Sequence, residues 1–411
     1  MIHIRETRAA VRLQCWLGVM LLAAGIFGTP VYSGSDDFKS ISTLIGKKDS
    51  ILVADPRGQI LFARNKDTKL VPASILKIFT SLVALHYLGP DYRFKTEFYL
   101  DEASNLKIRG LGDPLLISEV VNDISRHLAG KLNTSKNLKH LILDNSYFNQ
   151  PLTIPGITSS SQPYDAPNGA LCVNFNTVNF KHTNNGYVSA EPQTPLLPFA
   201  LKKIKQSGRD EGRIVFSHED HEITLYAGSL FKYFLNENGI EFSGSVKLGR
   251  VNARADRLLF RYVSRTSLKQ IISKLLEHSN NFTTNQLLIT SGIKAYGPPG
   301  TLEKGVATAL HYAEDVLKMN GITIFEGSGI SRKNRVSAAH MHRVLDTFAP
   351  YYLLMNRQNN EFYKTGTLYG ISTRAGYIQG REGQLYRYVV MINTPGKSTA
   401  KIMRILKRTL D

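Results

Sequence analysis

The sequence predicts an α+β protein in which an antiparallel sheet flanked by helices carries a large α+β insertion. Residues 50–54 and 59–63 are apolar runs on either side of an Asp-Pro-Arg-Gly turn, which predicts a hairpin near the start of the chain. Near the end, apolar runs on both sides of residues 380–383 predict a second hairpin, and residues 398–410 follow as an amphipathic helix. We therefore expect both chain ends to contribute to one sheet.

A block of mixed character lies between these two ends. It contains helical stretches at 119–128 and around 230–235, together with short apolar runs that predict strands. The expected strands are residues 95–100, 106–111, 140–143, 171–173, 212–217 and 246–251.

A helix that is apolar on almost every side is predicted over residues 75–88, between a Pro72-Ala73 entry and a Gly89-Pro90 exit. Such a helix is buried, so placing the Lys77 amine on its first turn would cost free energy, which indicates a function for this residue. Ser74 stands three positions earlier, so both side chains project from the same helical face. This context separates the copy of Ser-x-x-Lys at Ser74 from the other four in the chain, which begin at Ser104, Ser229, Ser291 and Ser398.

The Ser74–Lys77 pair predicts acyl-transfer chemistry. A serine hydroxyl is a weak nucleophile and needs an adjacent base. A desolvated lysine near other cations has a lowered pKa, so its neutral amine can accept the hydroxyl proton. In isolation, the same residues fit a helix-capping serine and a lysine that extends to the surface.

Ser279-Asn280-Asn281 follows the amphipathic run 268–278 and precedes a second helical stretch, 282–290. A helix–helix connection of this kind can present a hydroxyl and an amide to a cleft. We predict that Ser279 relays a proton to the leaving group and that Asn281 holds the substrate amide. In isolation, a polar turn explains the same residues.

The single Lys-Thr-Gly of the chain, at Lys364, begins a strand-like segment that turns back at residues 380–383 and so belongs to the second hairpin. We assign Lys364, Thr365, Gly366 and Thr367 to substrate binding. The Lys364 ammonium would meet a substrate carboxylate and help to lower the pKa of Lys77. Gly366 lets a peptide lie against the strand, and the amides of Thr367 and Ser74 would form an oxyanion hole. A surface lysine in an ordinary strand is the alternative.

The first 33 residues have the pattern of an export signal. Three arginines precede an apolar run at 16–28, and residues 29–34 form a small-residue cleavage region. The pattern predicts a periplasmic or otherwise extracytoplasmic protein, with an uncleaved membrane anchor as the alternative.

The composition excludes several functional classes. A net charge of +18 suits an anionic surrounding such as wall polymer or lipid headgroups, and the chain has neither a run of five basic residues nor a zinc-finger spacing, which argues against nucleic acid. The two cysteines, Cys15 and Cys172, leave one thiol and no internal disulfide once the signal is removed. No cluster has metal-ligand spacing, so we predict neither a metal nor a cofactor.

Together the motifs and their surroundings resemble the class C low-molecular-mass penicillin-binding proteins, which are D-alanyl-D-alanine carboxypeptidases with endopeptidase activity. The resemblance runs from about residue 50 to the C-terminus and implies the penicillin-recognising serine transferase fold, with its large insertion between Ser-x-x-Lys and Ser-x-Asn. Glu326 stands where the family usually has Asp, a difference that we assign to a loop and not to the chemistry. Besides the three motifs, the matching segments are 72–80, 109–114, 143–148, 226–228 with 231, and 326–331.

The resemblance implies that Ser74 is the acyl-ester nucleophile and Lys77 the proton acceptor. It implies peptidoglycan stem peptides as substrates, cleaved at terminal D-alanine or at D-Ala-linked cross-bridges, and β-lactam antibiotics as covalent inhibitors. For Asp113 and Asp144 we expect turn or packing roles, although either could face a cationic stem residue.

Two other functions remain open: a β-lactamase of the same fold and a catalytically silent cell-wall-binding protein. The chain has no Tyr-x-Asn in place of the motif at Ser279 and no convincing additional glutamate, which argues against the first. The intact motif set argues against the second.

The predicted organisation has three parts. Residues 1–33 form the signal peptide. Residues 34–95 and 255–411 form a discontinuous catalytic domain. Residues 96–254 form the inserted α+β region, in one or two small domains, whose role the sequence leaves open.

Overall fold

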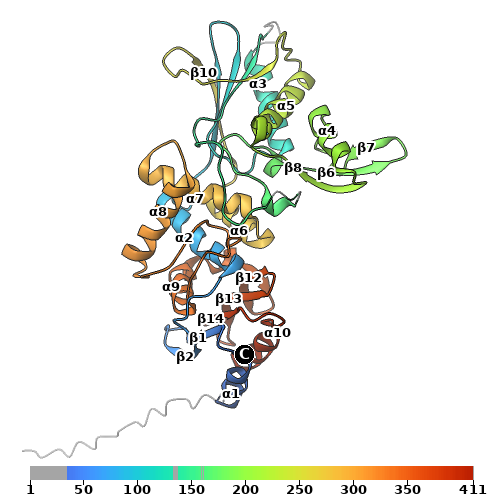
Figure 1. Cartoon of the computed structure of the whole chain (residues 1–411). Helices are drawn as coiled ribbons and strands as arrows, with labels where there is room; N and C mark the ends of the chain where they lie inside the picture. Colours follow the sequence, from blue (N-terminus) through green and yellow to red (C-terminus); the bar gives the residue numbers. More distant parts are fainter. Residues whose placement is uncertain (1–34, 133–137, 159, 161, 411) are drawn as a thin grey trace, which may run out of the picture.

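The computed structural model describes residues 35–132, 138–158, 160 and 162–410. The predicted export signal lies outside these residues. The described chain forms sheets at both ends of an elongated molecule with a layer of helices between them (Figure 1). The predicted α+β class is confirmed.

Both ends of the chain build one antiparallel six-stranded sheet, as expected from the sequence. β1 pairs with β14 along its whole length, from Asp49 opposite Ile392 to Ala54 opposite Arg387. The predicted N-terminal hairpin is β1 and β2, and the predicted C-terminal hairpin is β13 and β14. The strand order is β11 (Asn356–Gln358), β12 (Glu361–Leu368), β13 (Ile371–Gln379), β14 (Leu385–Ile392), β1 (Asp49–Ala54) and β2 (Ile60–Arg64).

Helices cover both faces of this sheet, which explains why its central strands are apolar at consecutive positions. Ile51 and Val53 of β1 pack with α1 (Ser35–Leu44) and α10 (Ala400–Leu410). Leu52 and Ala54 alternate to the opposite face and join the larger core, which contains α2 (Leu76–Leu88) and α9 (Ala338–Phe348).

The middle layer consists of α2 with α6 (Leu268–His278), α7 (Asn281–Tyr296) and α8 (Leu302–His311). The predicted burial of α2 is confirmed, since its residues from Leu76 to Leu85 are all buried. α7 and α8 cross closely at two glycines: a Cβ on Gly292 would lie 2.5 Å from the amide nitrogen of Gly305. This contact fixes the position of α7, the helix that begins at Asn281, relative to α8.

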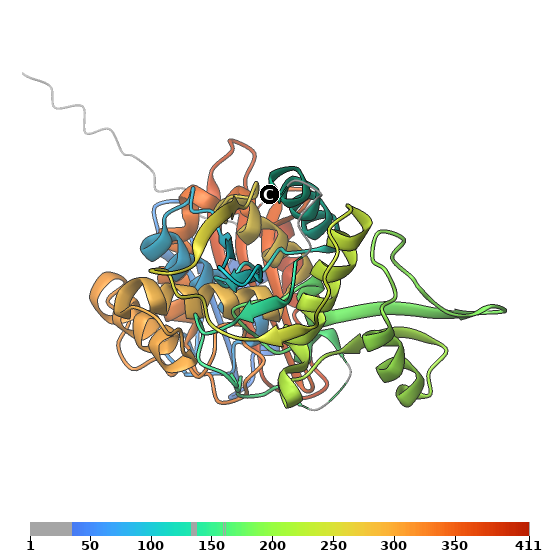
Figure 2. The same ribbon diagram turned by 90° about the horizontal axis from the view of Figure 1, so that it is seen from above.

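The inserted region contains two further sheets. The larger one is antiparallel across β10, β3 and β4 and parallel across β4, β5 and β9, and α3 and α5 supply buried residues to its core. The smaller one, β7-β6-β8 with α4, projects to one side (Figure 2). The bounds are β3 (Lys95–Leu100), β4 (Leu106–Gly110), α3 (Ser118–Leu132), β5 (Leu141–Asp144), β6 (Thr177–Thr183), β7 (Gly186–Ser189), α4 (Pro198–Ser207), β8 (Glu211–Val215), α5 (Glu222–Glu237), β9 (Val246–Leu248) and β10 (Arg257–Val263).

Short helical turns complete the fold. They are η1 (Ala73–Ile75), η2 (Pro163–Asp165), η3 (Asn174–Asn176), η4 (Glu219–His221), η5 (Tyr312–Val316) and η6 (Ala349–Leu354), of which η5 is a π-helix and the others are 3₁₀-helices.

Two local predictions need correction. Residues 171–173 form a bend in the core of the inserted region and not a strand. Lys364 lies on β12, a strand separated from the predicted hairpin by the turn at Tyr369-Gly370. β10 pairs with β3. If the chain is divided so that this sheet stays intact, the inserted region ends after Val263 and not at residue 254. We propose that boundary for the two regions.

Candidate active site

Ser74 lies at a tight turn, η1, immediately before α2. Ala73 precedes it with a φ of +49°, the left-handed region that a residue with a side chain adopts only at a cost of about 1–2 kcal/mol. The turn is held from outside by Gly329, whose backbone approaches so closely that an added Cβ would overlap the carbonyl oxygen of Ala73. Packing therefore imposes the conformation that presents Ser74.

Lys77 is completely buried, and its amine has three oxygen neighbours. The Nζ atom lies 3.0 Å from Ser74 Oγ, 2.7 Å from Asn281 Oδ1 and 2.7 Å from the carbonyl oxygen of Ser328. The amide and backbone oxygens can only accept hydrogen bonds, so they take both hydrogens of a neutral amine. The lone pair of that amine is then left for the Ser74 hydroxyl.

Burial lowers the pKa of Lys77 to about 7, and the positive charge of Lys364 acts in the same direction while the Glu326 carboxylate opposes it. Burial also lowers the pKa of Lys364, to about 8. A substantial fraction of Lys77 is therefore neutral near pH 7. The charge of Lys364 thus acts on the pKa of Lys77 in the predicted direction.

The Glu326 carboxylate organises the loop that delivers the Ser328 carbonyl to Lys77. It is fully buried and accepts hydrogen bonds from the backbone amides of Ser328 at 2.6 Å, Gly329 at 2.8 Å and Ser331 at 3.2 Å. Asn334 Nδ2 donates a further bond at 2.7 Å. The expectation that residue 326 affects only a loop was too narrow, because this loop contacts the amine directly.

The connection between α6 and α7 turns Ser279 and Asn281 towards the same space. Ser279 ends α6 with a φ of +53°, and Asn280 caps α7 by accepting a hydrogen bond from the Thr283 amide at 2.8 Å. Asn281 is then fixed between Lys77 and the carbonyl oxygen of Tyr164, which lies 3.3 Å from Nδ2.

β12 passes directly beside the nucleophile turn. A Cβ on Gly366 would lie 2.7 Å from the Ser74 amide nitrogen. Its partner on β13, Thr373, donates a hydrogen bond of 2.7 Å to the carbonyl oxygen of Pro72. Lys364 lies on the same strand face as Gly366, and its Nζ donates to the Thr365 carbonyl oxygen at 2.9 Å.

These elements surround a cleft of about 700 Å³. The structure brings four of the predicted site residues together in its lining, Ser74, Ser279, Asn281 and Thr367, while Lys77 and Lys364 are buried. Thr365 and Gly366 are not among the lining residues. The remaining lining residues were not predicted as site residues from the sequence; they are Pro155, Gly156, Thr158, Tyr164, Asp165, Ile330, Ser331, Arg332, Lys333 and Leu368.

The other residues considered in the sequence have structural roles. Asp113 accepts a hydrogen bond from the Leu115 amide at 2.9 Å, and Asp144 from the Ser146 and Val251 amides, each at 2.9 Å. Neither lines the cleft, as expected of turn residues. Cys172 is buried, and burial raises its pKa to about 12.

Within the described ranges, no group of three or more His, Cys, Asp and Glu side chains is arranged to hold a metal ion. The helices in those ranges are all too short or too polar to cross a bilayer.

Solved structures share the whole architecture. Penicillin-binding protein 4 (dacB) from Haemophilus influenzae aligns with a TM-score of 0.72 at 18% identity, over 90% of this chain and 98% of that one. The same protein complexed with a novel β-lactam aligns with a TM-score of 0.67 at 17% identity, over the same shares of the two chains. The chain thus has the penicillin-recognising fold.

Sequence comparison gives the family. A D-alanyl-D-alanine carboxypeptidase from Actinomadura sp. (strain R39) is 24% identical over 438 aligned residues, which cover 88% of this chain and 81% of the relative. The D-Ala-D-Ala carboxypeptidase 3 (S13) family model matches residues 43–210 and 211–359. The chain belongs to this family. The match ends before Lys364, so the role of the Lys-Thr-Gly strand rests on its geometry.

Proposed function

We propose that the chain is a serine DD-peptidase of peptidoglycan that removes terminal D-alanine, cleaves D-Ala-linked cross-bridges, or does both. The observation that carries the proposal is the buried Lys77 amine, 3.0 Å from Ser74 Oγ and held by two acceptor-only oxygens. Membership of a D-Ala-D-Ala carboxypeptidase family supports the substrate class.

In the proposed acylation, Ser74 Oγ attacks the carbonyl carbon of a D-Ala-D-Xaa bond while its proton passes to Lys77 Nζ. The backbone amides of Ser74 and Thr367 would stabilise the tetrahedral oxyanion. As the carbon–nitrogen bond breaks, the leaving amine receives a proton relayed through Ser279. Water then attacks the ester and releases the free serine.

Substrate binding is assigned to the remaining residues of the cleft and its strand. Asn281 Nδ2 would donate a hydrogen bond to the substrate amide carbonyl, and the peptide would run along β12 from Lys364 to Thr367 as an added strand. A β-lactam would occupy the same place and acylate Ser74. The β-lactam complex of the Haemophilus protein supports this choice of inhibitor.

The same proposal includes location and organisation. Residues 1–33 would export the chain to the periplasm, where its net positive charge favours contact with anionic wall polymer or lipid headgroups. Residues 34 to about 94 and about 264–411 would form the catalytic domain, and the region between them would be the accessory part.

Digestion of purified muropeptides tests the proposal. We expect wild-type protein to release terminal D-alanine or to split cross-linked dimers, and Ser74→Ala to lose this activity. Ser398→Ala, at the exposed serine of another Ser-x-x-Lys, is the matched control and should retain it. Muropeptides left intact by the folded wild-type protein, or cleaved equally by Ser74→Ala, would contradict the proposal.

The pH dependence of acylation follows from the two lysines. Because Lys77 acts as a neutral base with a pKa of about 7, kcat/KM for a carboxylate-bearing substrate should rise as the pH increases through that value. Because Lys364 binds the carboxylate as a cation with a pKa of about 8, kcat/KM should fall again above that value.

In Lys364→Ala, loss of the neighbouring charge should move the rising limb to higher pH. Stopped-flow penicillin acylation across this range measures both limbs. A rising limb that stays unchanged in this variant would reject the coupling between the two lysines.

A further inference from the structure

A cavity of about 360 Å³ lies over one face of the larger sheet of the inserted region. The register of three neighbouring strands brings its charged side chains together, because Glu97 of β3 stands opposite Arg261 of β10 and opposite Arg109 of β4. Lys95 precedes Glu97 by two positions and projects from the same face, whereas Phe98 projects into the core shared with α3 and α5. The remaining lining residues are Tyr92, Leu111 and Tyr147. The cavity is thus built on the polar face of this sheet.

The lining of this cavity carries an excess of positive charge. Among the described residues that line it, Glu97 is the only carboxylate, against three cations. Glu97 accepts hydrogen bonds from Arg261 Nε and from the Tyr99 hydroxyl, each at 2.8 Å. Arg109 Nη1 lies 3.8 Å from the same carboxylate, which therefore holds two guanidinium groups in position but neutralises one charge. The exposed Lys95 ammonium makes no hydrogen bond or ion pair within the part of the chain that the structure describes.

The polar groups that remain free in the cavity are hydrogen-bond donors. Lysine and arginine side chains have no acceptor atom, and both oxygens of Glu97 are already engaged. In the described ranges, the hydroxyls of Tyr92 and Tyr147 make no hydrogen bond, and Arg109 Nε is buried without a partner. A ligand that suits this lining must therefore supply acceptor oxygens and negative charge.

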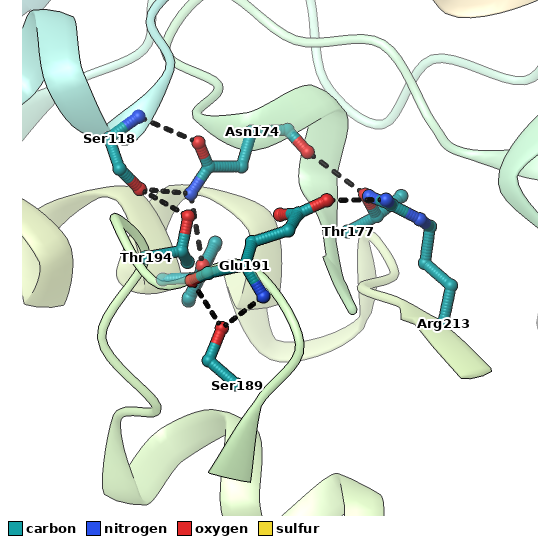
Figure 3. A network of polar contacts seen from close by, with 8 residues as sticks. Ser118, Asn174, Thr177, Ser189, Glu191, Thr194 and Arg213 are labelled. Atoms are coloured by element: carbon teal, nitrogen blue, oxygen red, sulfur yellow. Dashed lines mark hydrogen bonds and ion pairs between the residues drawn. The ribbon is translucent and has the colours of Figure 1, made fainter. Parts of the chain in front are cut away.

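Other cations of the inserted region are matched by carboxylates. In the network of Figure 3, Arg213 Nη2 donates a hydrogen bond of 2.6 Å to Glu191 Oε1, so one guanidinium meets one carboxylate. Lys107 of β4 lies 2.9 Å from Asp256 and 3.4 Å from Asp101. The unmatched charge in the cavity is thus a local feature and not a general property of this region.

The cavity is separate from the proposed active-site cleft. None of the described residues lines both spaces. The Tyr147 carbonyl oxygen accepts a hydrogen bond of 2.9 Å from the Gly300 amide, just after α7 has ended. Asn281, which contacts Lys77, is the first residue of α7. The two spaces therefore lie towards opposite ends of this helix, which is about 24 Å long.

We propose that this cavity binds a phosphate group, either as free phosphate or as part of a larger molecule. Guanidinium groups pair with phosphate through two parallel hydrogen bonds, and a lysine adds a compact charge. A phosphate monoester carries about 1.5 to 2 negative charges near pH 7, which matches three cations less one carboxylate. A carboxylate ligand would leave part of this charge unmatched. The binding site does not depend on the peptidase function.

Isothermal titration calorimetry of the full chain, with inorganic phosphate as the probe at constant ionic strength, tests the site. We expect saturable binding of one phosphate per chain. Lys95→Glu should weaken it at least about tenfold, because this change removes the excess charge without leaving the buried Glu97 unpaired. Lys95→Arg, which keeps the charge, should bind like the wild type. Lys205→Glu, at an exposed lysine of α4 outside the cavity, is the matched control and should also bind normally.

Flotation with phosphatidylcholine vesicles that contain phosphatidic acid distinguishes the sources of the phosphate. Flotation that inorganic phosphate competes and that Lys95→Glu loses would support a lipid headgroup. Calorimetric binding without flotation would support a soluble phosphate compound. No binding of inorganic phosphate, equal binding by folded Lys95→Glu and wild type, or equally effective displacement by acetate would overturn the proposal. Thermal unfolding verifies that each variant is folded.

Discussion

Lys77→Ala is expected to lose penicillin acylation by roughly 10³-fold or more, the scale that follows removal of a base from a catalytic unit. Within the described residues, the Lys77 amine is the only nitrogen that is hydrogen-bonded to Ser74 Oγ. It is oriented by Asn281 and Ser328. Without it, the hydroxyl has no group to take its proton. The rate constant for acylation by a fluorescent penicillin measures the loss.

Lys294→Ala is the matched control for this prediction. Lys294 belongs to another Ser-x-x-Lys, the one at Ser291, but its side chain is exposed on α7. The control should acylate at the wild-type rate. Because removal of Lys77 also leaves two buried oxygens unpaired, thermal unfolding must show that Lys77→Ala is folded; acylation near the wild-type rate in that variant would reject the lysine as base.

Gly366→Ala is expected to lower kcat/KM on the order of 10²-fold, comparable to the loss of one oxyanion-hole donor. The added Cβ would lie 2.7 Å from the Ser74 amide nitrogen and 3.0 Å from Ala73 Cβ, and it would overlap the Thr373 hydroxyl. The strand must then withdraw from the nucleophile turn, which separates the amides of Ser74 and Thr367. Steady-state hydrolysis of a D-Ala-D-Ala peptide measures the effect.

Gly130→Ala provides the control for the glycine substitution. Gly130 lies in the exposed part of α3, and a Cβ there meets no atom within 4 Å. The control should leave activity unchanged and, because alanine favours helix more than glycine does, should not lower stability. Full activity in Gly366→Ala would mean that the close passage of β12 is not required for catalysis.

Much of the fold could be predicted because its signals are local. The helix after Ser74 is apolar on almost every side, and β1 and β14 are apolar at consecutive positions because helices cover both faces of the sheet. β10 escaped prediction because it is an edge strand whose residues are mostly exposed and whose apolar residues are interrupted by Arg261. Residues 171–173 are apolar because they fill a core, although they form a bend.

Within the site, side chains could be predicted and backbone contacts could not. Ser74, Lys77, Ser279 and Asn281 follow from motif chemistry, and the structure places them together. The Ser328 carbonyl oxygen also accepts a hydrogen bond from the Lys77 amine. It could not be predicted, because every residue has a backbone oxygen and Ser328 lies 251 positions along the chain from Lys77.

The central claim is that Ser74 is the nucleophile, and peptide mapping of the penicillin adduct by mass spectrometry tests it most directly. Denatured, proteolysed acyl-enzyme should carry one penicilloyl group on the peptide that contains Ser74, and Ser74→Ala should carry none. An adduct on any other serine, or equal labelling of the variant, would contradict the account.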